Sequence, residues 1–163
     1  MGVIEIRPYR EDDLEALRAI MNEIVARGDA FTYEAPFTPE AMRAYIESYS
    51  ATFTAMGGRG VVGGYLLRPN QPGRGAHVCN ATYMVGAAAR GRGVGRLMGE
   101  HSLGEAKRMG FREMQFNAVV STNAPAVELW KSLGFEVIGV SPRAFRMADG
   151  SFVDLYVMHR TLG

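Results

Sequence analysis

The chain has 163 residues, of which 47% are apolar and 21% charged, which is enough apolar material for one domain with a sizeable core. Its formal net charge of +1 argues against nucleic acid or a membrane surface as the main partner. No apolar run approaches the roughly 20 residues that span a bilayer, and residues 1–8 carry charges where a signal peptide needs an apolar core. A single cysteine, Cys79, excludes an intramolecular disulfide. We therefore expect one cytoplasmic domain over residues 1–163.

Seven strands and four helices are predicted along the chain. Apolar side chains recur at helical spacing between Glu11 and Gly28, and Thr38 before Pro39 is typical of a helix start. In chain order we expect a strand at Val3–Ile6, helices from Glu11 to Gly28 and from Pro39 to Tyr49, strands at Thr52–Met56, Val61–Leu67 and His77–Val85, a helix from Gly93 or Val94 to Met109, a strand at Glu113–Val120, a helix from Pro125 to Gly134, and strands at Phe135–Val140 and Phe152–Met158. This order predicts an α/β (α+β) fold with a mixed sheet.

A glycine-rich segment lies where a strand meets a helix, at Arg90-Gly91-Arg92-Gly93-Val94-Gly95. The first amides of a helix have no partner within the helix and carry partial positive charge, so anions bind there. Glycine lets a phosphate approach the backbone without meeting a Cβ atom, and the nearby arginines add positive charge. The segment has neither the Gly-Lys-Ser/Thr of a Walker loop nor the interval of a dinucleotide fingerprint. We expect a phosphate cradle, and the alternative is a glycine-rich turn with solvated arginines.

Arg90, Gly93 and Gly95 fill the signature Q/R-x-x-G-x-G/A of the GNAT acetyltransferases, which this chain resembles. Asn123–Phe135 resembles a second signature of that family, an asparagine before a helix that ends in Gly-Phe, and Ile4–Leu14 resembles the opening strand and helix. The resemblance covers nearly the whole chain. It implies a single GNAT-like domain with a mixed, mostly antiparallel sheet of about seven strands, about four flanking helices and splayed central strands. It also implies an acetyl-CoA-dependent N-acyltransferase with acetyl-CoA as co-substrate and no metal.

The resemblance places the cofactor in a V-shaped opening between the strands that end at Val85 and Val120. Pantetheine would pair with the backbone like an added strand, and the helix amides would hold the pyrophosphate. Asn123 would bind the pantetheine arm or hold its loop. The residues expected at the cofactor are Met84, Val85, Gly86, Arg90, Gly91, Arg92, Gly93, Val94, Gly95, Arg96 and Asn123.

The tyrosine that many family members place in the late helix, as the acid for the leaving thiolate, is replaced here by Trp130. Indole cannot act as a general acid at neutral pH, so we expect Trp130 in the core, and Tyr83 is also expected to pack there. The strand His77–Val85 contains no carboxylate to act as a base. The lone Cys79 is expected to be inert packing rather than an acetylated nucleophile.

Asn80 and Asn117 are polar residues within apolar strands, so each needs a hydrogen-bond partner. With Asn123 they resemble, at the same intervals, the asparagines of fungal GNAT enzymes that acetylate proline analogues. That resemblance implies that Asn80 grips a substrate carboxylate and that Asn117 and Asn123 are catalytic residues at the reaction centre. Tyr33 is expected to bind the acceptor, because the loop Phe31–Phe37 would border it. The alternative for the strand asparagines is a hydrogen bond to a splayed strand edge.

Three functions remain open on the sequence alone. The first is an N-acetyltransferase that acts on a small-molecule amine, such as an amino or imino acid or an analogue, by direct transfer. The second is a protein or peptide N-acetyltransferase, and the third is a non-catalytic sensor that binds acetyl-CoA. The expected partners are the amine acceptor and a second copy of the chain in a homodimer, with no nucleic acid and no membrane.

Overall fold

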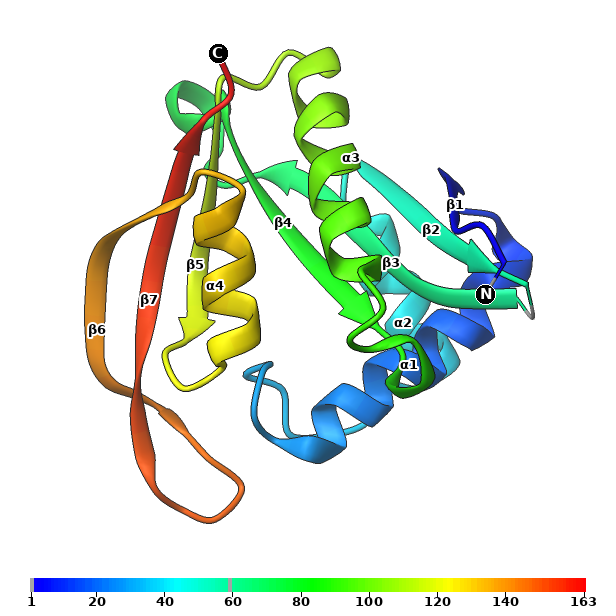
Figure 1. Cartoon of the computed structure of the whole chain (residues 1–163), viewed down its shortest axis with the longest axis horizontal. Helices are drawn as coiled ribbons and strands as arrows, with labels where there is room; N and C mark the ends of the chain where they lie inside the picture. Colours follow the sequence, from blue (N-terminus) through cyan, green and yellow to red (C-terminus); the bar gives the residue numbers. More distant parts are fainter. Residues whose placement is uncertain (1, 59) are drawn as a thin grey trace.

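The computed structural model describes residues 2–58 and 60–163, which form a seven-stranded sheet with two helices on each face (Figure 1). The strand order is β1-β2-β3-β4-β5-β7-β6, and all neighbours pair antiparallel except β4 and β5. The elements are β1 (Glu5–Pro8), α1 (Leu14–Arg27), α2 (Pro39–Glu47), β2 (Ala51–Gly57), β3 (Gly60–Pro69), β4 (Val78–Val85), α3 (Val94–Arg108), β5 (Glu113–Val120), α4 (Ala124–Ser132), β6 (Glu136–Arg146) and β7 (Phe152–Thr161). The expected mixed sheet with four flanking helices is confirmed.

The predicted boundaries are least accurate at the two edges of the sheet. β1 begins at Glu5 rather than Val3, because Glu5–Pro8 pair with β2 while Val3 is 91% exposed. β6 continues well beyond the expected Val140, as far as a pair with Phe152 of β7. Most β6 side chains are exposed, so no alternation of apolar and polar residues marked its second half.

The centre of the sheet opens into a V between β4 and β5. These strands run parallel and pair only at their first residues, Val78 with Glu113 and Cys79 with Met114. Beyond those pairs β5 stays bound to β7 and β4 stays bound to β3, so the two halves of the sheet diverge (Figure 1). The expected splaying of the central strands is confirmed, and the rest of β4 has a free edge toward the gap.

The helices cover the two faces of the sheet with apolar side chains. α1 buries the face that its spacing predicted, which consists of Leu14, Leu17, Ile20, Met21 and Ile24. With α2 it covers Leu66 and Met84 on one side of the sheet, while α3 and α4 cover the other side. The central strands are packed on both faces, so the parting of β4 and β5 opens a space between the two halves of the sheet.

A buried carboxylate ties the start of α1 to β1 and β2. Asp13 is 4% exposed and accepts hydrogen bonds from two guanidinium nitrogens of Arg7, both at 2.8 Å. It also accepts from the Arg10 amide at 2.9 Å and from the Thr54 hydroxyl at 3.1 Å. These donors, with Arg7 the strongest, outweigh the effect of burial and lower the pKa of Asp13 below its ordinary value.

We predict that Asp13→Asn lowers the free energy of unfolding by roughly 1.5–3 kcal/mol at neutral pH, because it weakens hydrogen bonds to a charged group. A lowered folded-state pKa means that this stabilisation is present above the unfolded value of about 3.9 and is lost as the pH falls through the folded value. Urea unfolding curves of the wild type and the variant should therefore converge in acid. Asp12→Asn, at an exposed neighbour, is the control. A stability difference that is independent of pH would contradict this account.

The outer edge of the sheet carries exposed apolar side chains. On β6, Ile138 is 56% exposed and Val140 is 52% exposed, and Phe152 of β7 is 52% exposed. The expected homodimer stays a prediction.

Judged by the length and apolarity that a bilayer crossing demands, none of the helices in the described segments qualifies as a membrane span.

Candidate active site

The glycine-rich segment after β4 forms an open cradle at the start of α3. Gly93 caps α3, and Gly91 and Gly93 take left-handed φ angles of 70° and 79°. A Cβ atom at either position would meet nothing within 4 Å, so the backbone here borders open space. The cradle faces a cavity of about 820 Å³, whose lining includes eight of the residues expected at the cofactor: Val85, Arg90, Gly91, Gly93, Val94, Gly95, Arg96 and Asn123.

Two of the three expected arginines border this cavity. Arg90 forms an ion pair with Glu23 of α1, and Arg96 donates to the Ser132 hydroxyl at 2.6 Å. Arg92 lines a separate hollow on the other side of the loop. Exposed pairs of this kind contribute little to stability. Arg90 and Arg96 can therefore exchange these partners for phosphate oxygens at small cost.

Of the backbone segment expected beside pantetheine, Val85 lines the cavity, whereas Met84 and Gly86 do not. The Met84 side chain is fully buried under α1 and α2, and the Gly86 amide donates to the Val62 carbonyl at 2.9 Å. Successive residues of a strand direct their backbone groups to opposite edges, so Val85 directs its amide and carbonyl toward the gap. The free edge of β4 is thus available next to the cradle.

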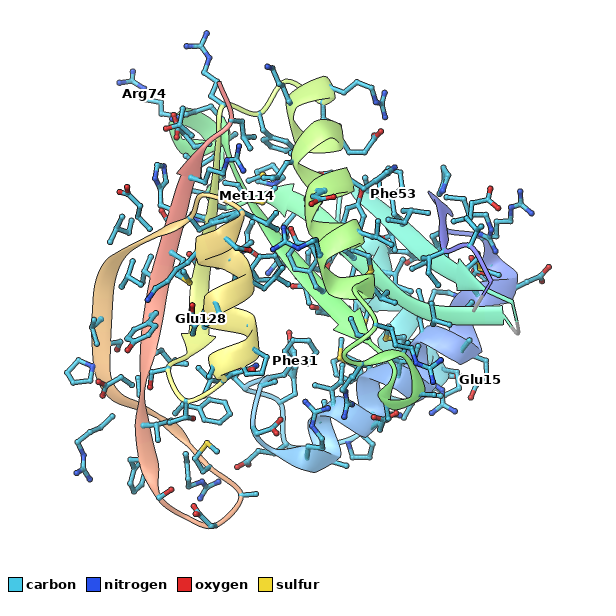
Figure 2. All side chains as sticks on the ribbon, in the orientation of Figure 1. Glu15, Phe31, Phe53, Arg74, Met114 and Glu128 are labelled. Atoms are coloured by element: carbon cyan, nitrogen blue, oxygen red, sulfur yellow. The ribbon has the colours of Figure 1, made fainter. Side chains whose placement is uncertain are left out.

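A second cavity of about 450 Å³ continues from the cradle into the gap between β4 and β5, and we call it the cleft. The residues common to both linings are Arg27, Val85, Arg90, Gly95, Asn123, Pro125 and Leu129, so cradle and cleft form one channel. Figure 2 labels two residues that help to locate it. Met114 lies on β5 where the two strands still pair, and Phe31, from the loop after α1, lines the cleft.

All three asparagines singled out in the sequence line this cleft. Asn80 donates to the Gln115 carbonyl at 3.0 Å, which joins β4 to β5 just beyond their last paired residues. Asn117 donates to Asn70 at 2.7 Å and accepts from Gln115 at 3.0 Å. Asn123 accepts from an amide in the first turn of α4 at 3.4 Å. The Asn80 bond is the strand-edge interaction named as the alternative for this residue, and the functional roles of the three asparagines stay predictions.

Tyr45 of α2 and Tyr49, two residues after the end of α2, contribute hydroxyl groups to the cleft that the sequence analysis missed. The Tyr45 and Tyr49 hydroxyls lie 3.0 Å apart, and the Tyr49 hydroxyl lies 3.0 Å from the hydroxyl of Thr82 on β4. Tyr33 packs edge-on against Tyr45. Both Tyr33 and Arg68, at the end of β3, line the cleft. The spacing of Tyr45 and Tyr49 indicated a buried helix face, but it carried no signal that this face borders a cavity.

Trp130 and Tyr83 pack in the core, as expected. Trp130 is 8% exposed, and its ring centroid lies 4.6 Å from that of Tyr83 and 4.7 Å from that of Phe116. The Tyr83 hydroxyl lies 2.7 Å from the Ser102 hydroxyl on α3, and burial raises the pKa of Tyr83. These two rings form one wall of the cleft, and Tyr83 keeps its proton at neutral pH because its pKa is raised.

Within residues 2–58 and 60–163, the lining of the cleft contains no carboxylate. Cys79 is fully buried outside that lining, and burial raises its pKa to about 12, so almost no thiolate exists at neutral pH. Burial also raises the pKa of Tyr45. His77 is exposed and borders neither cavity. The expected inert role of Cys79 agrees with this geometry, and these three side chains offer no base to the cleft.

Comparison with known proteins places this geometry among acetyltransferases. Residues 18–135 match the model of the Acetyltransferase (GNAT) family. The structure of a GCN5-related N-acetyltransferase from Kribbella flavida is 44% identical, with a TM-score of 0.92 and 97% of each chain covered. YwnH of Bacillus subtilis, named a putative phosphinothricin acetyltransferase, is 27% identical over 96% of this chain and 98% of its own length.

A fungal protein also matches, over a shorter stretch. N-acetyltransferase aca1 of Schizosaccharomyces pombe is 35% identical over 98 residues, which are 60% of this chain and 47% of aca1. The match therefore spans less than half the length of that relative. Over this stretch it supports the resemblance to fungal enzymes loosely, and it leaves the acceptor unassigned.

We predict that Gly93→Glu raises the Kd of acetyl-CoA at least about a hundredfold, because bulk and negative charge would enter the cradle. Isothermal titration calorimetry would measure the change. Gly93→Ala shares the left-handed backbone strain without the charge and should bind more tightly than Gly93→Glu. Gly104→Glu is the matched control, since it puts the same charge into open space further along α3. Unchanged affinity in a folded Gly93→Glu protein would rule out the cradle as the cofactor site.

Proposed function

Because the chain belongs to the GNAT family of acetyl-CoA-dependent N-acetyltransferases, we propose that it moves an acetyl group from acetyl-CoA directly to the amine of a small molecule. The observation that carries this proposal is the single channel formed by the cradle and the cleft. A cofactor held in the cradle and an amine held in the cleft would meet beside the free edge of β4. Holding two reactants together in this way can supply much of the rate of a bimolecular reaction.

The residues present fit acetyl-CoA, the co-substrate of this family. The open amides of the cradle and Arg96 would hold the pyrophosphate, and Val85 and Asn123 would hold the pantetheine arm. Arg27 adds a donor where the two cavities meet, because its Nη1 is buried without a partner among the described residues. A cofactor with carbonyl and phosphate oxygens would satisfy that nitrogen. When bound, acetyl-CoA supplies an acetyl group activated as a thioester.

We assign the acceptor to the part of the cleft that lies between α2 and β5. Tyr33 and Asn80 would bind it there, while Asn117 and Asn123 would act at the reaction centre as hydrogen-bond donors or acceptors. Transfer forms a bond between nitrogen and the acetyl carbon, breaks the carbon–sulfur bond, and moves one proton overall from the amine to the released thiol. The position of Cys79 outside the lining supports transfer without an acetylated cysteine.

The cleft favours a small acceptor over a peptide. Its volume is about 450 Å³, and the β4–β5 pairing closes one end. Its charged lining residues are Arg27, Arg68 and Arg90, with no carboxylate among the described residues to attract a basic peptide. The similarity to YwnH over nearly its whole length supports the same choice, because that protein's name specifies a small-molecule acceptor.

Turnover of acetyl-CoA with a panel of acceptors tests the proposed function. Thiol release would be followed with amino acids, imino acids, simple amines, peptides with free amino termini and no acceptor. We expect acetylated product with at least one small amine and little with peptides. Binding of acetyl-CoA without turnover on any acceptor would favour a sensor, and preference for peptides would favour a protein acetyltransferase; either result overturns the proposal.

We predict that the pH dependence of kcat/KM follows the acceptor rather than the protein, since we assign water as the acceptor of the amine proton. Only the unprotonated amine can attack, so kcat/KM should rise about tenfold per pH unit up to the pKa of the free amine and then level. For two acceptors whose amine pKa values differ by about two units, the pH profiles of kcat/KM should level off about two pH units apart. A bend at the same pH for both would reveal a base on the protein.

Asn80→Ala should reduce kcat/KM about ten- to two-hundredfold for acceptors that carry a carboxylate, because it removes a hydrogen bond to a charged group. Acetyl-CoA affinity should change little. Asn117→Ala and Asn123→Ala should instead slow every acceptor. Since Asn80 also donates to the Gln115 carbonyl, thermal unfolding of Asn80→Ala is needed as a control. Equal losses for acceptors with and without a carboxylate would mean that Asn80 does not bind the carboxylate and only links β4 to β5.

A further inference from the structure

Three arginines line the cleft, and their charges are compensated differently. Arg27 pairs with Asp29 at 3.0 Å, and Arg90 pairs with Glu23. Arg68, at the end of β3, has no acidic partner within 4.0 Å among residues 2–58 and 60–163. Its positive charge is therefore the uncompensated one in a cleft whose described lining contains no carboxylate.

The Arg68 side chain is exposed, and it contacts an aromatic ring rather than an acidic partner. Its guanidinium carbon lies 4.4 Å from the centroid of the Tyr49 ring, a distance typical of a cation–π interaction. The Tyr49 hydroxyl is held in turn by Tyr45 and Thr82, each 3.0 Å away. A guanidinium stacked on an anchored ring keeps its planar edge of N–H donors free, and less side-chain entropy is lost when a ligand binds.

Arg68 also lies beside the residue assigned to the acceptor. In the antiparallel β3–β4 pair, Arg68 is directly opposite Asn80, and facing residues in such a pair have Cβ atoms roughly 4.5–5.5 Å apart on the same side of the sheet. The amide of Asn80 already donates to the Gln115 carbonyl. The neighbouring Arg68 is charged and forms no ion pair among the described residues, so it is the stronger hydrogen-bond donor at this end of the cleft.

We propose that Arg68 anchors a carboxylate of the acceptor and so selects amino or imino acids over amines that lack a carboxylate. The inference rests on the proposed function and adds the charge that the substrate must carry. A carboxylate matches the paired N–H groups of a guanidinium, and the bond between two charged groups is stronger than one to a neutral amide. Asn80 would contribute a second, weaker donor to the same carboxylate.

The test compares Arg68→Met and Arg68→Lys on α-amino or imino acids and on the corresponding amides, which keep the amine but lack the charge. For Arg68→Met we expect kcat/KM with the acids to fall about ten- to two-hundredfold, mainly through KM, because a charge-assisted hydrogen bond is lost. With the amides it should change less than about threefold. Arg68→Lys keeps the charge but not the paired geometry, so its loss should be intermediate.

Two further measurements separate this role from a structural one. Acetyl-CoA affinity and the thermal unfolding midpoint should be nearly unchanged in both variants. Arg74→Met is the matched control, since Arg74 is exposed on the loop after β3 and outside the cleft lining (Figure 2). Equal losses with acids and amides, or wild-type preference for the amides, would overturn the role of Arg68 and leave the proposed function intact. Absence of turnover with every acceptor would overturn the proposed function, and this inference with it.

Discussion

The parting of β4 and β5 after two parallel pairs is the constraint on which the site depends. Each strand is held on its outer edge, β4 by β3 and β5 by β7, so the divergence frees backbone on β4 without unravelling the sheet. Helices cover both faces, so their side chains line the space that opens. Asn80 makes the last link across the junction, to the Gln115 carbonyl. The cradle follows β4 after one short turn, so the same strand leads to both the proposed anion site and the free edge beside it.

The fold and the cradle could be predicted because both rest on local signals. Glycine at 91 and 93 is needed where the chain takes positive φ before α3, and the face of α1 follows directly from helical spacing. β6 could not be bounded, because its side chains are mostly exposed and pack too little to impose a pattern. The asparagines were found by their chemistry, as polar residues in apolar strands, and the structure brings all three to one cavity. Their roles nevertheless depend on what the cleft binds.

The positions of Arg68 and Tyr49 at the cleft could not be predicted from the sequence. Arg68 is an exposed residue beside Pro69 at a strand end, and Tyr49 lies two residues after the end of α2. Neither position is unusual for its residue type. The antiparallel register of β3 with β4 sets Arg68 opposite Asn80. The packing of the segment just after α2 brings the Tyr49 ring to the guanidinium. Contacts between residues this far apart in the chain have no signature in either local segment.

The charge pattern of the cleft also bears on how an amine could react where the described lining holds no carboxylate. In a free amino acid the carboxylate stabilises the ammonium beside it. Pairing that carboxylate with Arg68 would remove this stabilisation, and the cleft offers the ammonium no acidic replacement among the described residues. Moving a charged group from water into such a site favours its neutral form, so the bound amine would lose its proton more easily than the free one. The absence of a carboxylate from the described lining leaves the cleft without an obvious base. The same absence would favour the neutral, reactive form of the bound amine, with water accepting the proton.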